Sequence, residues 1–339
     1  MMAKRVRRPL SVLIKPASSR CNLRCTYCFY LEKQEIYPWK DHPALTIEAF
    51  RTFCEQYAAV SPMLAFNWQG GEPTLMGLDF FREAVAVQRE AADAASNGRT
   101  LPITNALQTN GTLLNEDWAQ FLHENGFLVG ISVDGPAEWH DTYRYDTRGR
   151  ATHSKVLHAL DLLRARDVPF NILTVVSQSN VERPRELLRY LVDNDLYDLQ
   201  FIPCMERLPA EHPHVGELTD YSITPEQYGR FLTDVFDEWV KIGYHKLRVR
   251  YFDNIIQMAL GLPAEMCQLA VSCGYLVLEH NGDIYPCDFF VEPEWVLGNV
   301  HEQTIADMVS GPLFRQFNGM KPEVNEECTR CQWRPLCHG

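Results

Sequence analysis

Hydrophobic and polar positions follow two alternating patterns along much of the chain. One pattern is a short run of apolar and β-branched residues bounded by turn residues, which is typical of a buried strand. The other is a longer segment with apolar residues at helical spacing, as in 46–60, 78–95 and 154–167. Asn115 and Ser154 are predicted N-caps for two of the helices. Six runs fit strands: 11–16, 63–69, 102–110, 127–135, 170–176 and 199–204.

This regular alternation of strand and helix predicts a parallel α/β sheet. Six units are fewer than the eight of a closed TIM barrel. We therefore expect a partial (β/α)6 TIM-like barrel, with a doubly wound sheet as the alternative. Polar motifs follow the predicted strands, where ligand sites of α/β folds gather. These motifs are CNLRCTYC (21–28), QGGEP (69–73), QTNG (108–111), SVDG (132–135) and CME (204–206).

The pattern changes after a strong predicted helix at 224–243. The remainder is richer in cysteine, and the stretch 275–290 contains short apolar runs around NGD, a hairpin turn signal. We place a domain boundary near residue 245. The prediction is a barrel domain at 1–245 and a cysteine-rich domain at 246–339.

The chain is acidic, with a formal net charge of −12 over 339 residues. Such a balance argues against electrostatic binding to nucleic acid or to an anionic membrane. No apolar stretch is long enough for a transmembrane helix or for the core of a signal peptide. We therefore predict a cytoplasmic protein that has neither nucleic acid nor a membrane as a partner.

Eleven cysteines need an explanation other than disulfides, because the number is odd and cytoplasmic thiols stay reduced. Cys21, Cys25 and Cys28 form C-x3-C-x2-C after the first predicted strand. A structural zinc site takes four ligands, whereas three thiolates on a four-iron cluster leave one iron free. We favour the cluster, with a zinc site completed by a distant residue, or buried free thiols, as alternatives. Cys54 and Cys204 are predicted core residues.

The run CNLRCTYCFY resembles the cluster loop of the radical S-adenosylmethionine (AdoMet) enzymes, and GGEP (70–73) resembles their second signature. In that superfamily the free iron binds AdoMet, whose cleavage yields a 5′-deoxyadenosyl radical. The resemblance implies AdoMet as a cofactor. For the residues that would contact AdoMet, the alternatives are structural roles, such as capping a turn or forming a surface ion pair. The residues implied in AdoMet binding are Gly70, Gly71, Glu72, Ser132, Arg144 and Met205.

The later cysteines resemble the SPASM domain, an extension that carries two auxiliary four-iron clusters. By that resemblance the chain holds three 4Fe–4S clusters in all, with a zinc ribbon as the alternative for the second half. The family pattern continues with two more cysteines, so we expect this chain to be truncated at its C-terminus. The resemblance assigns Cys267, Cys273 and Cys287 to one auxiliary cluster, and Cys328, Cys331 and Cys337 to the other.

Block by block, from residue 11 onward, the chain is similar to the anaerobic sulfatase-maturating enzymes. These oxidise a cysteine or serine of an unfolded sulfatase to Cα-formylglycine. The resemblance implies Asp288 as the base, Tyr30 and Gln69 as substrate contacts, and a flavodoxin- or ferredoxin-type electron donor. Two alternatives stay open. One is another SPASM peptide maturase, for example one that forms thioether cross-links, and the other is a zinc-ribbon scaffold without catalysis.

Overall fold

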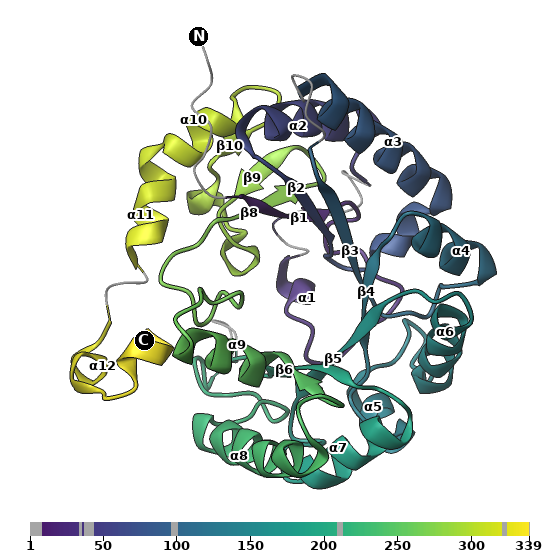
Figure 1. Ribbon diagram of the computed structural model, residues 1–339, viewed down its shortest axis with the longest axis vertical. Helices are drawn as coiled ribbons and strands as arrows, with labels where there is room; N and C mark the ends of the chain where they lie inside the picture. The colour runs from purple at the N-terminus through teal and green to yellow at the C-terminus, as the bar shows by residue number, and fades with distance from the viewer. Residues whose placement is uncertain are drawn as a thin grey trace.

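One ten-stranded sheet organises the part of the chain that the computed structural model describes, which is residues 9–33, 36, 44–95, 101–208, 213–320 and 324–338. The strand order is β10-β9-β8-β1-β2-β3-β4-β5-β6-β7, and the sheet curves around the middle of the molecule in Figure 1. The strands are β1 (Ser11–Lys15), β2 (Leu64–Trp68), β3 (Ile103–Thr109), β4 (Leu128–Ser132), β5 (Phe170–Val176), β6 (Asp198–Pro203), β7 (Arg248–Val249), β8 (Tyr275–Glu279), β9 (Asp283–Tyr285) and β10 (Gly298–Asn299).

The strand order confirms the partial barrel over the doubly wound sheet. Strands β1 to β7 pair in parallel and in chain order, without the reversal that defines a doubly wound sheet. On its other side β1 pairs in parallel with β8, which forms the predicted hairpin with β9. The sheet therefore runs on past residue 245, where the sequence predicts a domain boundary.

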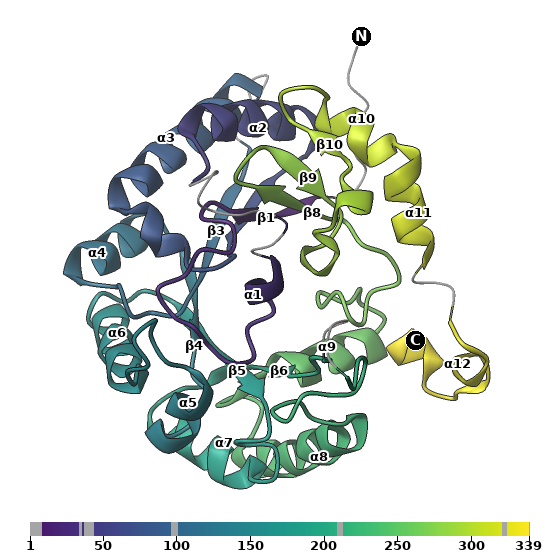
Figure 2. The ribbon, with the colours of Figure 1, turned by 180° about the vertical axis from the view of Figure 1, so that it is seen from behind.

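Helices cover the outer face of the sheet, and of the described helices only the short α1 lies inside the ring in both ribbon views (Figures 1 and 2). Because β1 to β8 pair in parallel, their carboxyl ends and the loops that follow them, including the one that carries α1, lie at the same end of the barrel. The helices are α1 (Tyr30–Lys33), α2 (Ile47–Val60), α3 (Leu78–Ala95), α4 (Glu116–Glu124), α5 (Ala137–Tyr143), α6 (His153–Ala165), α7 (Pro184–Asp193), α8 (Pro225–Ile242), α9 (Arg250–Ala259), α10 (Ile305–Ser310), α11 (Pro312–Met320), α12 (Glu326–Arg330) and α13 (Arg334–Cys337), with 3-10 turns η1 (Pro73–Met76), η2 (Asp288–Phe290) and η3 (Pro293–Trp295).

One of the two predicted helix caps is confirmed and the other is wrong. The Asn115 side chain accepts a hydrogen bond from Trp118 N at 3.0 Å and caps α4. Ser154 instead lies inside α6, which begins at His153. The reason is tertiary: Asp141 Oδ1, from α5, accepts hydrogen bonds from the backbone N–H groups of Thr152 at 2.8 Å and His153 at 2.9 Å. Those amides need no local cap.

The main core lies between the sheet and its outer helices. Aromatic rings from α2 and β2 pack together there, with Phe50 and Trp68 centred 5.2 Å apart and fully buried. Cys54 belongs to this core, as predicted. Cys204 is also buried, but it packs in a smaller cluster beside Cys25 and therefore lies next to the cluster loop.

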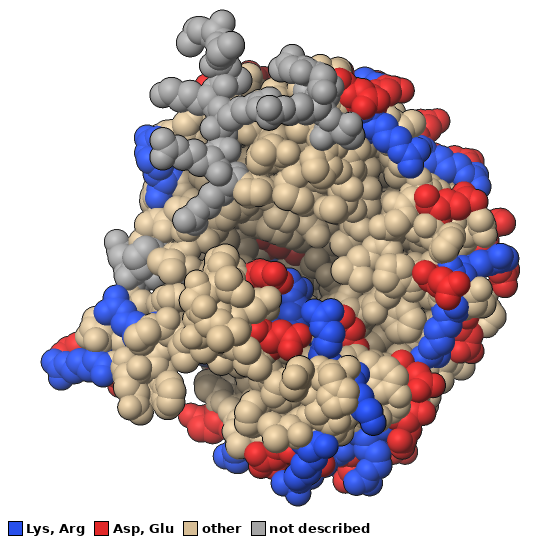
Figure 3. All heavy atoms as spheres, viewed as in Figure 1, with Lys and Arg blue, Asp and Glu red and all other residues tan. Residues whose placement is uncertain are grey.

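The interior of the ring is open on at least one face. The space-filling view shows a hollow at the middle of that face, with acidic and basic side chains along one side of it (Figure 3). Among the described residues, no helix combines the length and the apolar character that crossing a bilayer requires.

Candidate active site

The three-cysteine loop is held by hydrogen bonds to two other loops of the barrel. The backbone N–H groups of Arg24 and Thr26 each donate at 2.9 Å, to Tyr145 O and Tyr143 O respectively. Asn110 Nδ2 donates to Asn22 Oδ1 at 2.9 Å. These contacts fix the loop after β1 against the loop after β3 and the end of α5, so motifs far apart in sequence meet as predicted.

The glycines of GGEP are required by a close approach of two backbones. An added Cβ would lie 2.6 Å from Ser18 O at Gly70 and 2.1 Å from Arg20 O at Gly71. Gly70 also has a φ of +120°, which side chains rarely adopt. The Gly71 N–H donates to Ser18 O at 2.7 Å. The GGEP motif therefore packs directly against the backbone of residues 18–20, which precede Cys21.

Glu72 is fully buried and its carboxylate joins the segment after β2 to the end of β3. Oε1 accepts hydrogen bonds from Thr74 N at 3.0 Å, Thr74 Oγ1 at 2.7 Å and Thr109 Oγ1 at 2.8 Å, while Oε2 accepts one from Asn110 N at 2.8 Å. Burial raises the pKa of Glu72, and the hydrogen bonds oppose that rise. Only Oε2 keeps the capacity to accept another donor, so a further contact of this carboxylate would use that oxygen.

The chemistry of the three thiols fits an iron–sulfur cluster. Cys21 Sγ accepts hydrogen bonds from Leu23 N at 3.3 Å and Asn110 Nδ2 at 3.6 Å, which favours negative charge on that sulfur. Burial raises the pKa of the Cys21 thiol to about 12, with a further rise from Glu72, and burial raises that of Cys25 to about 11. A bound cluster would therefore have to displace protons from thiols that are otherwise neutral.

Across the described ranges, no three His, Cys, Asp or Glu side chains are arranged to hold a single metal ion. The thiols of a four-iron cluster each bind a different iron, so they need not converge on one point.

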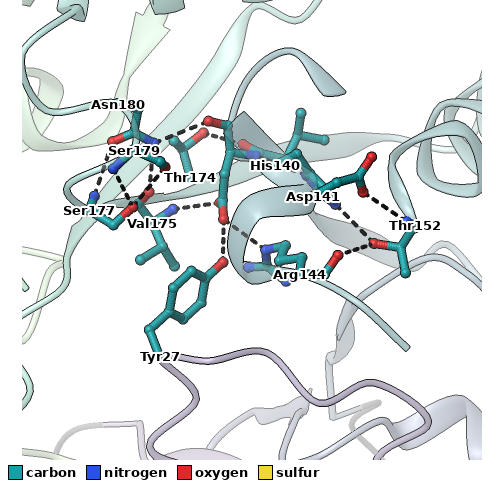
Figure 4. A network of polar contacts seen from close by, with 12 residues as sticks. Tyr27, His140, Asp141, Arg144, Thr152, Thr174, Val175, Ser177, Ser179 and Asn180 are labelled. Atoms are coloured by element: carbon teal, nitrogen blue, oxygen red, sulfur yellow. Dashed lines mark hydrogen bonds and ion pairs between the residues drawn. The ribbon is translucent and has the colours of Figure 1, made fainter. Parts of the chain in front are cut away.

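Asp134 lies in the loop after β4 and contacts the cluster loop; its partners Tyr27, Arg144 and Val175 are labelled in Figure 4. Its Oδ2 accepts hydrogen bonds from the Tyr27 hydroxyl and from Arg144 Nε, the latter at 2.9 Å, and its Oδ1 accepts one from Val175 N at 2.9 Å. The Arg144 guanidinium also lies 5.5 Å from the Tyr27 ring centroid. Arg144 is thus paired in the interior, and the surface salt bridge considered for it from sequence is wrong.

His140 supports this network through contacts with Asp134 and Thr152. Its Nδ1 lies 3.3 Å from Asp134 N, and its Nε2 lies 3.3 Å from Thr152 Oγ1, which donates to Arg144 O at 2.9 Å. Burial lowers the pKa of His140 to about 4, so the ring is neutral at neutral pH. The hydrogen-bond pattern then assigns the proton to Nε2, leaving Nδ1 to accept from Asp134 N–H.

A second polar network contains the three residues predicted to act on substrate. The Tyr30 hydroxyl donates to Asp288 Oδ2, and Gln69 Nε2 donates to the Tyr30 oxygen at 3.0 Å. The three come from α1, the loop after β2 and η2. Burial raises the pKa of Tyr30 well above its usual range, and the Asp288 carboxylate adds to that rise. Tyr30 therefore stays a hydrogen-bond donor.

Sequence reasoning missed a buried lysine and glutamate in the same network. Lys15 Nζ lies 2.6 Å from Glu279 Oε1 and 3.4 Å from Asp288 Oδ1. Burial lowers the pKa of Lys15, but Glu279 and Asp288 together raise it above its ordinary value. The sequence did contain a signal for this pair: Lys15 and Glu279 are each the last residue of a strand and directly follow its apolar residues. Charged residues there rarely lack a partner.

The structure places the other predicted site residues as follows. Ser132 is buried at the end of β4, and Met205 follows β6 with 44% of its surface exposed. The remaining six cysteines lie in the second part of the chain. Burial raises the pKa of the Cys287 thiol to about 11, and the charges of Cys273, Asp288 and Cys267 raise it further. Cys328 lies in α12, Cys331 directly follows it, and Cys337 ends α13.

Comparison with known families defines the class of protein. Residues 16–191 match the radical SAM superfamily, and residues 267–332 match SPASM, an iron–sulfur cluster-binding domain. Both matches agree with the parallel partial barrel and the two groups of cysteines. The protein is therefore a radical AdoMet enzyme with a SPASM domain, and its cofactors are AdoMet and iron–sulfur clusters.

Two curated relatives and a solved structure narrow the family. The serine-type anaerobic sulfatase-maturating enzyme of Bacteroides thetaiotaomicron is 36% identical over 98% of this chain and 82% of its own. The cysteine-type enzyme of Clostridium perfringens is 38% identical over 98% of this chain and 88% of its own. Native anSMEcpe with bound AdoMet and the Cp18Cys peptide has a TM-score of 0.88 at 38% identity, covering 98% of this chain and 88% of that one.

The chain belongs to the anaerobic sulfatase-maturating enzymes, which use radical AdoMet chemistry to convert a cysteine or serine of a sulfatase to formylglycine.

Proposed function

We propose that Asp288 is the base of this oxidation and that Tyr30 and Gln69 orient the target side chain. The convergence of these three residues, from segments as far as 258 positions apart, is the observation that carries the proposal. AdoMet and its cluster, when bound, supply the radical that removes a hydrogen atom from the substrate's Cβ. Asp288 would accept the proton of the substrate's thiol or hydroxyl, while Tyr30 and Gln69 would hold that group in place.

The two oxygens of Asp288 differ in a way that supports the base role. Oδ2 accepts the Tyr30 hydroxyl, while Oδ1 has no hydrogen-bond partner among the described residues, although the Lys15 ammonium lies 3.4 Å away. Oδ1 is therefore the acceptor for a substrate proton. Gln69 fixes the Tyr30 oxygen, so the carboxylate is held by a chain of two hydrogen bonds rather than by one flexible side chain.

The proposed cofactor set is three 4Fe–4S clusters and AdoMet. Cys21, Cys25 and Cys28 would hold the cluster that binds AdoMet. We assign the AdoMet contacts to Gly70, Gly71, Glu72, Ser132, Arg144 and Met205. The auxiliary clusters would be held by Cys267, Cys273 and Cys287, and by Cys328, Cys331 and Cys337. We place the division between the barrel unit and the unit that binds the auxiliary clusters near residue 245.

The proposed substrate is an unfolded segment of a sulfatase that carries the target residue. A related structure, native anSMEcpe, contains a bound peptide, Cp18Cys, which supports a peptide segment as the ligand. Identities of 36% and 38% to serine-type and cysteine-type relatives do not favour one target over the other. We further propose a flavodoxin- or ferredoxin-type electron donor and reaction in the cytoplasm, where all eleven cysteines, which are free thiols in the structure, would stay reduced.

Asp288→Asn tests the assignment of the base. With dithionite, AdoMet and a sulfatase peptide, we expect the variant to form 5′-deoxyadenosine at close to the normal rate. Formation of the aldehyde, followed by mass spectrometry, should fall by roughly 10²- to 10⁴-fold, the usual contribution of a positioned base. Matched peptides with cysteine or serine at the target position identify the preferred residue. Undiminished aldehyde formation by the variant would remove Asp288 from this role.

Iron analysis tests the number of clusters. Anaerobically reconstituted protein should contain about twelve irons per chain, and Cys25→Ala or Cys287→Ala should each lose about four. Cys204→Ala is the matched control, because Cys204 is buried beside the loop but is not one of the predicted ligands. Iron loss in Cys204→Ala equal to that in Cys25→Ala would contradict the ligand assignment.

A further inference from the structure

The buried lysine at the end of β1 is in direct contact with Asp288, the proposed base, and with Tyr30, which holds it. Its Nζ lies 3.4 Å from Asp288 Oδ1 and 4.9 Å from the centroid of the Tyr30 ring. The Lys15 side chain is 1% exposed and the Asp288 side chain 9%, so little water screens the contact. An ammonium in that position attracts the carboxylate and the face of the ring at once.

Strand register determines why Lys15 lies there. Lys15 of β1 is paired with Glu279 of β8, so the two side chains emerge next to each other at the same edge of the sheet. Glu279 is fully buried, with Oε1 on Lys15 at 2.6 Å and Oε2 at 3.2 Å from His280 Nδ1. Glu279 thus acts as the counter-ion that lets a charged lysine remain in the interior.

A purely structural ion pair would not need the second carboxylate. Burying two charges is costly, and apolar residues of the same size are often as stable in such a position. Here a single ammonium is shared between Glu279 and Asp288, and the longer contact is with the residue that receives the substrate proton. The arrangement keeps Asp288 Oδ1 facing the ammonium while Tyr30 holds Oδ2.

We propose that Lys15 is a positioning residue for the oxidation: its ammonium fixes the Asp288 carboxylate and the Tyr30 ring in the orientation that meets the substrate's thiol or hydroxyl. This inference rests on the proposed role of Asp288. Lys15 acts through Asp288 and Tyr30, and the proton of the substrate goes to Asp288. Glu279 serves to hold Lys15.

Three variants separate positioning from stability in the reconstituted enzyme. Lys15→Met leaves Glu279 buried without its counter-ion, so we expect both the melting temperature and kcat to fall. The double variant Lys15→Met/Glu279→Gln removes both charges and should recover most of the melting temperature. Lys33→Met is the matched control, because Lys33, the last residue of α1, pairs with Glu292 at 3.6 Å and donates to Val291 O at 3.4 Å.

We expect the double variant to keep its low activity. Its kcat for the aldehyde should stay roughly ten- to a hundred-fold below the wild type, as for a reacting group displaced by about 1 Å. The KM for the peptide should change by less than about threefold, and aldehyde formed per 5′-deoxyadenosine should fall with kcat. Lys33→Met should stay within about twofold of the wild type in all three measures.

Each outcome distinguishes a positioning role for Lys15 from a purely structural ion pair with Glu279. Recovery of both melting temperature and kcat in the double variant would make the pair structural and overturn the proposal. If the double variant fails to fold, Glu279→Gln alone decides: it keeps Lys15 beside Asp288, so kcat should stay within about threefold, and a loss as large as that of Lys15→Met would overturn the proposal. Asp288→Asn measured in parallel separates the two claims, because normal aldehyde formation there refutes the base itself.

Discussion

The ion pair between Asp134 and Arg144 offers a quantitative test of how the cluster loop is anchored. The two side chains are 2% and 10% exposed, and Asp134 accepts three hydrogen bonds through its two oxygens. In Asp134→Asn the one remaining oxygen serves Val175 N–H. The amide group would then face the Arg144 Nε–H, donor against donor. We expect a loss of about 3–5 kcal/mol in the free energy of unfolding, as when one partner of a buried pair is removed.

A double-mutant cycle isolates the pairing itself. Arg144→Met leaves Asp134 with the Tyr27 hydroxyl and Val175 N–H, so its cost should lie near the lower end of that range. Asp134→Asn/Arg144→Met has no buried charge left, so its cost should be smaller than the sum of the single costs by about 1–3 kcal/mol. Anaerobic urea unfolding followed by tryptophan fluorescence and circular dichroism gives each value.

Arg166→Met provides the matched control for this cycle. Arg166 pairs with Glu116 at 3.0 Å, but the two side chains are 44% and 64% exposed. Its loss should change the free energy of unfolding by no more than about 0.5 kcal/mol. Additive costs at Asp134 and Arg144, or a cost for Asp134→Asn no larger than that of Arg166→Met, would refute the claim that this buried pair anchors the loop.

Two further predictions concern the supports of the site. Gly71→Ala would bring a Cβ to 2.1 Å from Arg20 O, so the segment before Cys21 must shift and iron content should fall by about four per chain. Gly229→Ala, in α8, meets no atom within 4 Å and should keep its iron. His140 has a pKa of about 4 when folded, against an ordinary value of 6.5, so the unfolded chain takes up the proton first and stability is lost as the pH falls below 6.5. Urea unfolding at pH 7 and pH 5 should show a loss about 2 kcal/mol larger in the wild type than in His140→Gln, and equal losses would contradict a buried neutral ring.

Much of the fold was predictable because its signals are local. Apolar runs located β1 to β6 to within three residues at each end, since strands that pack against a core are rich in apolar and β-branched residues. The order of strand and helix gave the parallel sheet, because parallel neighbours need a crossover. Ser154 failed as a cap for the opposite reason: the amides at the start of α6 are satisfied by Asp141, a residue of another helix.

The same distinction between local signals and long-range contacts applies to the site. The sequence by itself determined the three-cysteine loop, the glycines beside it and the set of later cysteines, because ligand spacing and backbone freedom are properties of a few adjacent residues. It also brought Tyr30, Gln69 and Asp288 into view, through resemblance to a family. Only the tertiary structure decided that Lys15 and Glu279 belong to the same polar network as Tyr30, Gln69 and Asp288. The contact between Lys15 and Glu279 depends on the register of β1 with β8, which no local pattern specifies.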